Sequence, residues 1–350
     1  MVWLSLPQLL YSVFLPSLAI AQTAEEPSES NEAFDVRTFE PPKRVEVKTP
    51  RYPRAYLVQG REGWVTMSMM IDPEGKPYDV TVTNSSDDLR FEEAAVKAAE
   101  LMRYEPALLD GVPIDSGTSF RITFELQGGE VGAGTKFVSR YRRLIKAISD
   151  NEHEVAKERV ELLEKMDRNL YEEAYFQMGL FRFARQWGDE TQQYDALVRA
   201  AFFDKGRSFL SEAASLQVLQ LKLNLELKHG NLAAALATAK SLLEREVSLE
   251  TKGQIERVQT EVAEILDGDQ QLVAKGWIRR DNYYNHSLSR NSFALTSVEG
   301  DVAEIRLHCD KGYVGFNHQE GVEYTVHEDW DACRLIVIGD PGTTFNVAEG

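Results

Sequence analysis

The sequence predicts a multidomain α+β protein whose three parts differ in local pattern. Residues 42–128 combine short strands with an amphipathic helix, residues 137–267 are helical throughout, and residues 276–350 hold short strands between turns. Two observations separate the parts. The glycine-rich run 127–134 has the composition of a flexible link, and no proline occurs between Phe137 and Asp267.

The first part opens with a turn, a short helix and a hairpin. Proline presets the backbone angle of a first helical turn, and glycine is suited to a helix stop. Alternating apolar residues predict strands, and the Asp-Pro-Glu-Gly sequence between them predicts a turn. In chain order these elements are Tyr52-Pro53, a short helix over 54–59, Gly60, a strand over 64–71, a turn over 72–75 and a strand over 78–83.

A second helix and a third strand complete this part. Ser85, Ser86 and the two aspartates that follow supply capping groups, and the apolar residues between Phe91 and Met102 recur at helical spacing. We expect Pro106, Gly111 and Pro113 to break the chain. Residues 119–126 alternate cleanly and predict a strand, so the order is β-β-α-β with a short helix in front.

This order of residues resembles the C-terminal domain family of TonB. The family pattern contains Tyr-Pro, Glu-Gly-x-Val, Asp-x-x-Gly, Ser-Ser, Phe-x-x-Ala-Ala, Tyr-x-Pro, Gly-x-Pro and a last apolar strand. The matching residues here are Tyr52, Pro53, Ala55, Gly60, Glu62, Gly63, Val65, Asp72, Gly75, Ser85, Ser86, Phe91, Ala94, Ala95, Tyr104, Pro106, Gly111 and Pro113. Each match alone is weak, but the ordered set is specific and covers about a quarter of the chain.

The resemblance implies that the first part binds an extended peptide by adding it as a strand to a sheet edge. The implied partner is the N-terminal box of an outer-membrane receptor or another envelope protein, and a second copy of the chain is a further candidate partner. The implied peptide-binding residues are Tyr52, Pro53, Arg54, Ser119, Phe120, Arg121, Ile122, Thr123, Phe124, Glu125 and Leu126. No cofactor is implied.

The fate of the N-terminal segment distinguishes two forms of this function. Residues 1–21 are almost wholly apolar and end Ala19-Ile20-Ala21, which predicts a cleaved signal peptide and a periplasmic protein. If the segment stays uncleaved, it could just span a bilayer, and the chain would be a membrane-anchored energy transducer. A third hypothesis is that the protein is a structural scaffold of the cell envelope, and that its first part only forms dimers. We expect residues 22–41 to form a disordered acidic linker.

Charge and cysteine content constrain the partners and the compartment. The formal net charge of −17 argues against nucleic acid and against an anionic membrane surface, so membrane contact is expected only through an uncleaved N-terminus. The two cysteines, Cys309 and Cys333, fit an exported protein with one disulfide. This disulfide would tie the third-last region of the small β domain to its last strand. Two unpaired buried thiols are the alternative.

The second and third parts carry weaker family signals. In the second part, His229-Gly-Asn-Leu-Ala-Ala-Ala-Leu236 resembles the second helix of a tetratricopeptide repeat, but the spacing of the turns is irregular. We therefore expect a degenerate, tetratricopeptide-like array of helical hairpins, with an irregular α-bundle as the alternative. The third part predicts a small all-β domain with strands over 292–298, 303–308, 312–316, 323–326 and 333–338.

No catalytic constellation stands out, so we do not expect an enzyme. The sequence has no Gly-x-Ser-x-Gly elbow, and the glycine-rich run lacks the lysine of a phosphate loop. His308, His318, His327 and Cys309 could be drawn as a metal site, but their spacing fits no compact ligand motif. We expect surface or turn histidines instead, and solvated helix faces at Glu172 and Glu173.

Overall fold

A computed structural model describes residues 38–86, 88–126, 132–202, 209–279 and 282–350. The predicted signal peptide and residues 22–37 of the predicted linker lie outside these ranges, as do residues 127–131 of the predicted flexible link. In the ranges that the structure does describe, the helices contain no stretch both long and apolar enough to cross a membrane.

The first part is built on a three-stranded antiparallel sheet in the order β4-β3-β8. The central strand β3 (Gly63–Ile71) pairs with β4 (Pro77–Ser85) on one side and with β8 (Ser116–Phe124) on the other. The hairpin turn was predicted correctly. The Gly75 N–H donates to the Asp72 carbonyl at 2.9 Å, and Gly75 adopts the positive φ of 77° that favours glycine.

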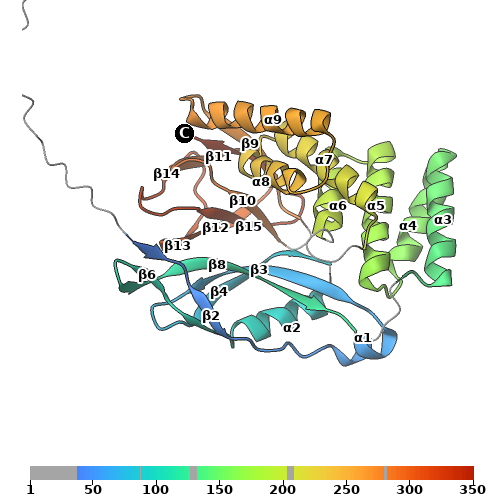
Figure 1. Ribbon diagram of the computed structural model, residues 1–350, viewed down its shortest axis with the longest axis horizontal. Helices are drawn as coiled ribbons and strands as arrows, with labels where there is room; N and C mark the ends of the chain where they lie inside the picture. The colour runs from blue at the N-terminus through green and yellow to red at the C-terminus, as the bar shows by residue number, and fades with distance from the viewer. Residues whose placement is uncertain (1–37, 87, 127–131, 203–208, 280–281) are drawn as a thin grey trace, which may run out of the picture. The chain divides into compact units, whose positions relative to one another are not determined.

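The two helices of this part also follow the sequence pattern. Helix α1 (Arg54–Gln59) ends at Gly60, which is left-handed, and α2 (Leu89–Ala99) begins at Asp88, whose carboxylate accepts a hydrogen bond from the Arg90 N–H. Helix α2 packs on β3 and β4, as Figure 1 shows. Its buried alanines let the helix lie close to the sheet, and Phe91 fills the space between them and β8.

Five short strands of this part were not predicted. They are β1 (Phe39–Glu40), β2 (Lys43–Glu46), β5 (Arg103–Glu105), β6 (Ala107–Leu109) and β7 (Val112–Ile114), which form one sheet in the order β1-β6-β7 and a second from β2 and β5. The expected chain break at Gly111 is instead a hairpin turn between β6 and β7. The expectation of disorder was also wrong for residues 38–41, because β1 pairs with Leu108 and Leu109. Strands of two to four residues are too short to show a periodic pattern.

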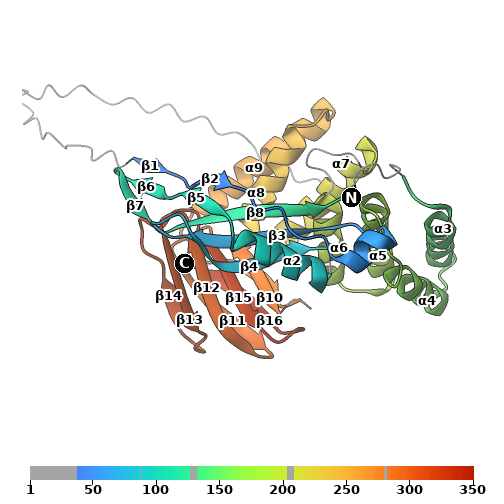
Figure 2. The same ribbon diagram turned by 90° about the horizontal axis from the view of Figure 1, so that it is seen from below.

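The second part contains seven helices among the described residues, and they span the stretch that was predicted to be helical. They are α3 (Thr135–Ser149), α4 (His153–Glu164), α5 (Leu170–Trp187), α6 (Glu190–Phe202), α7 (Glu212–Lys228), α8 (Leu232–Leu243) and α9 (Leu249–Asp267). Each helix contacts the next along the chain, and Figure 2 shows α3 to α6 following one another in this way. The tetratricopeptide-like assignment stays a prediction.

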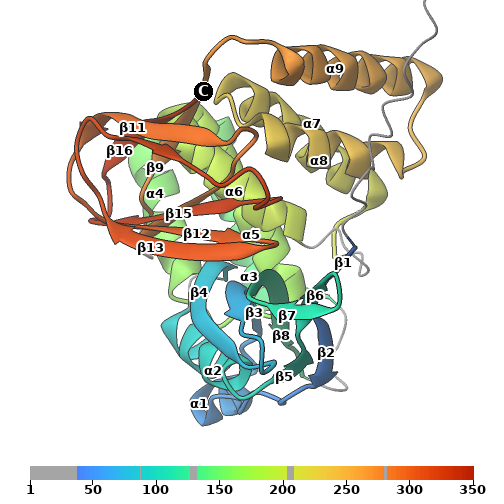
Figure 3. The ribbon, with the colours of Figure 1, turned by 90° about the vertical axis from the view of Figure 1, so that its left-hand side faces the viewer.

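The third part is formed by two four-stranded antiparallel sheets that enclose an apolar core (Figure 3). The strands are β9 (Leu272–Trp277), β10 (Tyr283–Ser287), β11 (Ser292–Glu299), β12 (Val302–Cys309), β13 (Gly312–Asn317), β14 (Glu323–Thr325), β15 (Arg334–Gly339) and β16 (Thr344–Glu349). The orders are β10-β15-β12-β13 and β14-β11-β16-β9. Strands β9, β10 and β16 were missed, so this part begins at Leu272 rather than at residue 276.

A disulfide joins Cys309 and Cys333 in this part. Cys309 is the last residue of β12, and Cys333 directly precedes β15, which pairs with β12. The expectation that the bridge reaches the last strand was wrong, because β16 follows β15 and pairs in the other sheet.

Candidate peptide-binding edge

The candidate edge is the outer side of β8. Among the described residues, β8 pairs only with β3, so its other side has no strand partner. Ser119 and Thr123 are exposed along it. Glu125 and Leu126 lie beyond the end of the strand, contrary to the prediction, and the Leu126 N–H already donates to Glu62 Oε1 at 2.8 Å.

Alternate β8 side chains serve two opposite faces of the sheet. Phe120, Ile122 and Phe124 pack with α2 in the core of the first part, so they position the strand. Arg121 points to the other face, where its Nε donates to Thr66 Oγ1 at 3.3 Å. Figures 2 and 3 show β2 beside β8, and the Arg44 guanidinium of β2 lies 4.3 Å from the centre of the Phe120 ring.

The predicted Tyr-Pro-Arg segment lies at the end of β8. Tyr52 is half-buried, with its ring centre 5.7 Å from that of Phe124 and 5.8 Å from that of Phe91. Its hydroxyl donates to the Arg61 carbonyl at 2.5 Å, and burial, aided by the charge of Glu62, raises its pKa to about 12. Tyr52 therefore fixes the chain at this end of the strand, and the exposed Arg54 is the member of the segment that a partner can reach.

The opposite sheet edge, formed by β4, is occupied by side chains of the third part. The Thr83 carbonyl accepts hydrogen bonds from Arg279 at 3.3 Å and from the Asn285 side chain at 3.1 Å. The Thr83 backbone acceptor is therefore already used. Of the two sheet edges, β8 is therefore the better candidate for an added strand.

The second face of the sheet is covered by the other two parts of the chain. Trp64 is 1% exposed and packs against Leu170, Ala174 and Phe181 in the helical part. At the other end of the sheet, a Cβ atom on Gly117 would lie 2.8 Å from the Cys309 carbonyl oxygen, so the backbones of β8 and β12 approach closely. The module is therefore held by neighbours on this face, whereas β8 pairs on its outer side with no strand of the described residues.

A buried polar cluster joins β3 and β4 to β12. His308 bonds through Nδ1 to the Ser68 hydroxyl at 2.8 Å and through Nε2 to Asp79 Oδ2 at 2.6 Å, and Arg306 donates to Asp79 Oδ1 at 2.7 Å. Burial alone would raise the pKa of Asp79, but the His308 hydrogen bond and the Arg306 charge together lower it. The expectation of a surface histidine was wrong for His308, which is 3% exposed.

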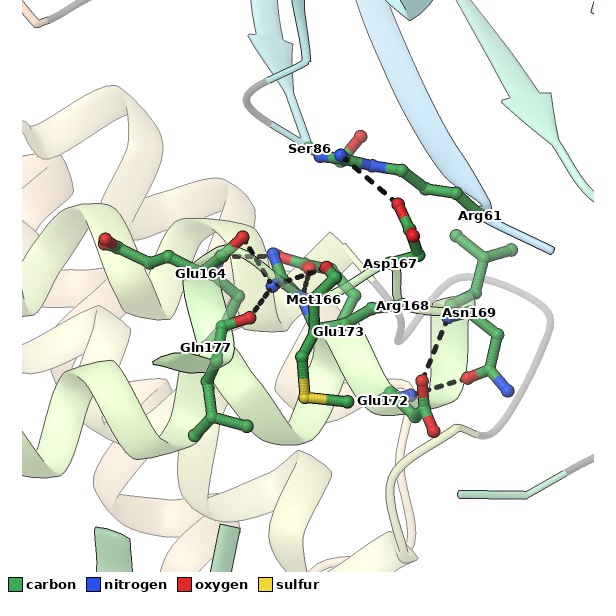
Figure 4. Close-up of polar contacts among 12 residues, drawn as sticks. Arg61, Ser86, Glu164, Met166, Asp167, Arg168, Asn169, Glu172, Glu173 and Gln177 are labelled. Atoms are coloured by element: carbon green, nitrogen blue, oxygen red, sulfur yellow. Dashed lines mark hydrogen bonds and ion pairs between the residues drawn. The ribbon is translucent and has the colours of Figure 1, made fainter. Parts of the chain in front are cut away.

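Glu62 connects the start of β3 to the helical part. One carboxylate oxygen accepts from the Leu126 N–H and the other from the Leu170 N–H at 3.0 Å, while the Glu62 N–H donates to the Arg168 carbonyl at 2.9 Å. Arg61, one residue earlier, pairs with Asp88 at 2.7 Å and points toward Asp167 at 3.8 Å (Figure 4). The Glu-Gly motif thus anchors the module to α5.

Arg168 and α5 form the buried side of this junction (Figure 4). Arg168 Nε lies 2.5 Å from Glu173 Oε2, and the Gln177 side chain donates to the other Glu173 oxygen at 2.7 Å. Glu172 caps α5 by a reciprocal pair of hydrogen bonds with Asn169. The expectation of solvated faces at Glu172 and Glu173 was therefore wrong, since they are 7% and 4% exposed.

Some of these residues could have been found from sequence and others could not. The Asn169-x-x-Glu172 spacing is a capping-box pattern that signals the start of α5. Nothing local marks Ser68 or Asp79, because their partners are more than two hundred residues away in the chain. The third part supplies no cluster of three or more acidic, histidine or cysteine ligands within the described residues, and Cys309 is held in its disulfide.

Comparisons with known proteins match this module. Residues 48–126 fit the family described as Gram-negative bacterial TonB protein C-terminal. Protein TonB of Vibrio cholerae is 29% identical over 110 residues, which are 30% of this chain and 45% of that protein. Protein TonB of Haemophilus ducreyi is 42% identical over 55 residues, which are 16% of this chain and 20% of that protein. The chain therefore spans less than half the length of these curated relatives.

A solved structure with related sequence is the solution NMR structure of the Pseudomonas aeruginosa TonB CTD. It is 24% identical, with a TM-score of 0.23, and the match covers 25% of this chain and 90% of that one. The family match coincides with the strands and helices described above, from the approach to Tyr-Pro to the end of β8. Residues 48–126 accordingly match the TonB C-terminal domain family.

Proposed function

We propose that this protein is a non-catalytic periplasmic adaptor in TonB-dependent transport and that it binds an extended peptide along the outer edge of β8. A partner strand gains affinity from main-chain hydrogen bonds and specificity from side-chain pockets. The observation that carries the proposal is the β8 edge, which has no strand partner among the described residues, beside exposed Ser119 and Thr123.

The partner that fits is an N-terminal receptor box or a similar extended segment of an envelope protein. Such a strand would run past Ser119 and Thr123 toward Tyr52, and Arg54 would lie at the end of its path. The contact between β8 and β12 near Gly117 limits the path at the other end of the strand. The usable edge is therefore the segment Ser119–Phe124, and the binding residues shift away from Glu125 and Leu126.

The periplasm is the compartment that suits this role. The Cys309–Cys333 disulfide fits an oxidising environment. The helical and β parts bury the second face of the sheet, so in this proposal they act as a rigid support that keeps the β8 edge presented to a partner.

The proposal is tested by site-specific crosslinking of the full chain. The described residues contain no free cysteine, so Thr123→Cys introduces one exposed thiol at the edge, and Thr260→Cys on α9 is the matched exposed control. With oxidised glutathione as the oxidant, a receptor-box peptide with one central cysteine should form a disulfide faster with Thr123→Cys than with Thr260→Cys. The same peptide with a proline beside that cysteine should lose the advantage, because proline cannot complete a strand ladder. Equal rates for the two protein variants, or for the two peptides, would reject strand addition at β8.

A further inference from the structure

A cavity of about 270 Å³ lies where the three parts of the chain meet. Strands β3, β4 and β8 supply the second face of the sheet, helices α6 to α8 supply one wall, and β9, β10 and β15 supply the other. Its volume falls near the lower end of small-molecule sites, which measure roughly 300–1,000 Å³. The candidate peptide edge is a separate feature, on the outer side of β8.

Several buried polar atoms of the lining lack a protein partner. Glu226 is 0% exposed and His286 is 2% exposed, yet Glu226 Oε2 and His286 Nδ1 make no hydrogen bond within the described residues. The same is true of one side-chain atom in each of Asn84, His229, Asn231 and Trp277. A buried polar atom without a partner is destabilising, so a group of them around one cavity favours an occupant that completes their hydrogen bonds.

The charge of the lining is opposite in sign to that of the chain. Five cationic side chains line the cavity, against the two carboxylates of Asp195 and Glu226, although the chain carries a formal charge of −17. Glu226 is paired with Lys222 on the same helix, and Asp195 lies 3.7 Å from Arg279. The side chains that line the cavity therefore carry a net positive charge, which favours binding of an anion.

Arg334 is the strongest anchor for that anion. Its guanidinium donates to the Asn285 side-chain oxygen at 3.3 Å, and no carboxylate of the described residues lies within ion-pair distance of it. Arg334 is partly buried, and this burial lowers its pKa, so its charge is partly shielded from water without an opposite charge in return. A bound oxyanion would supply that charge through charge-assisted hydrogen bonds.

Aromatic rings line the remainder of the cavity. The Trp277 ring centre lies 5.6 Å from that of Tyr194, 5.3 Å from that of His229 and 6.0 Å from that of Tyr284. The Trp277 Nε1 has no acceptor among the described residues. This surface suits the flat carbon skeleton of a small ligand, with a donor close to the rings.

We propose that the cavity binds a small organic anion, with its carboxylate or phosphate group at Arg334 and its carbon skeleton against Trp277 and Tyr284. The ligand would satisfy polar atoms contributed by all three parts of the chain, so its binding would also stabilise their junction. Carboxylate and phosphate share the oxyanion chemistry, and the experiment below distinguishes them.

The test uses benzoate, phenyl phosphate and benzylamine as probes of the full chain. All three carry the same ring, but only the first two are anions. We expect at least one anion to shift the indole resonance of Trp277 and the imidazole resonances of His229 and to raise Tm, while benzylamine does neither. The resonances are assigned with Trp277→Phe and His229→Gln. The anion that binds with the higher affinity shows whether the site prefers a carboxylate or a phosphate group.

Arg334→Met should weaken binding of that anion about tenfold or more, from the loss of a charge-assisted hydrogen bond. Arg143→Met, at an exposed position on α3, is the matched control and should bind normally. If Arg334→Met folds poorly, the comparison of the two anions with benzylamine on the unaltered protein tests the proposal. Failure of both anions to move the resonances at millimolar concentration overturns the proposal and leaves a water-filled cavity, and an equal response to benzylamine overturns the anion preference.

Discussion

Replacement of Arg168 by methionine tests the buried polar contacts that join α4 to α5, next to the junction with the first part. Arg168 is 8% exposed and Glu173 is 4% exposed. The guanidinium bonds Glu173 at 2.5 Å, the Glu164 carbonyl at 3.2 Å and the Met166 carbonyl at 3.3 Å, and it also bonds the Leu163 carbonyl. Its centre lies 4.2 Å from the centre of the Phe176 ring. Methionine keeps an unbranched apolar chain but removes every one of these donors.

The expected cost follows from the charge that remains. Glu173 would stay buried with the Gln177 side chain as its remaining donor among the described residues. Removing one partner of a buried ion pair typically costs about 3–5 kcal/mol. Arg159→Met provides the matched control. Arg159 pairs at 3.5 Å with Glu158, whose side chain is 61% exposed, so the change should cost about 0–1 kcal/mol.

The free energy of unfolding is measured from urea denaturation followed by circular dichroism. The double variant Arg168→Met/Glu173→Gln removes the buried charge as well, and it should be more stable than Arg168→Met alone. The prediction is refuted if the free energy of unfolding of Arg168→Met lies within about 1 kcal/mol of that of the parent. It is refuted equally if the double variant shows no recovery.

Three further predictions concern other contacts. The pKa of Asp79 is lowered in the fold, so its carboxylate stabilises the fold above the ordinary pKa of 3.8, and this stability is lost as the pH falls through and below that value. Asp79→Asn should therefore make the free energy of unfolding less dependent on pH in this acidic range. An unchanged pH dependence there would contradict the prediction. The double variant Cys309→Ser/Cys333→Ser should lower the free energy of unfolding by about 3 kcal/mol, because the disulfide closes a loop with a sequence separation of 24. Reducing the disulfide in the parent protein should lower it by a similar amount. Gly75→Ala should lower Tm more than Gly111→Ala, because both have positive φ but only Gly75 would clash, at 2.0 Å from a backbone oxygen.

The fold was predictable wherever a local pattern was long enough to be seen. The α2 helix, the β3–β4 hairpin and the helical stretch that contains α3 to α9 follow from apolar periodicity and from turn residues. Short strands such as β1 and β9 were missed because their pairing depends on partners far along the chain. The peptide-edge prediction located the strand but extended it to Glu125 and Leu126, since alternation continues past the last paired residue, Phe124.

The TonB-like module, the helical stretch and the later β part could be predicted from the amino-acid sequence alone, because turns, caps and periodicity are local properties of the chain. Which edge of the sheet lacks a strand partner, which face is covered and where a cavity forms depend on the packing of distant segments. Thr66, Glu226 and Arg334 line one cavity although no sequence spacing connects them. Burial and unmet hydrogen bonds arise only when distant segments pack together, so they could be recognised only in the folded chain.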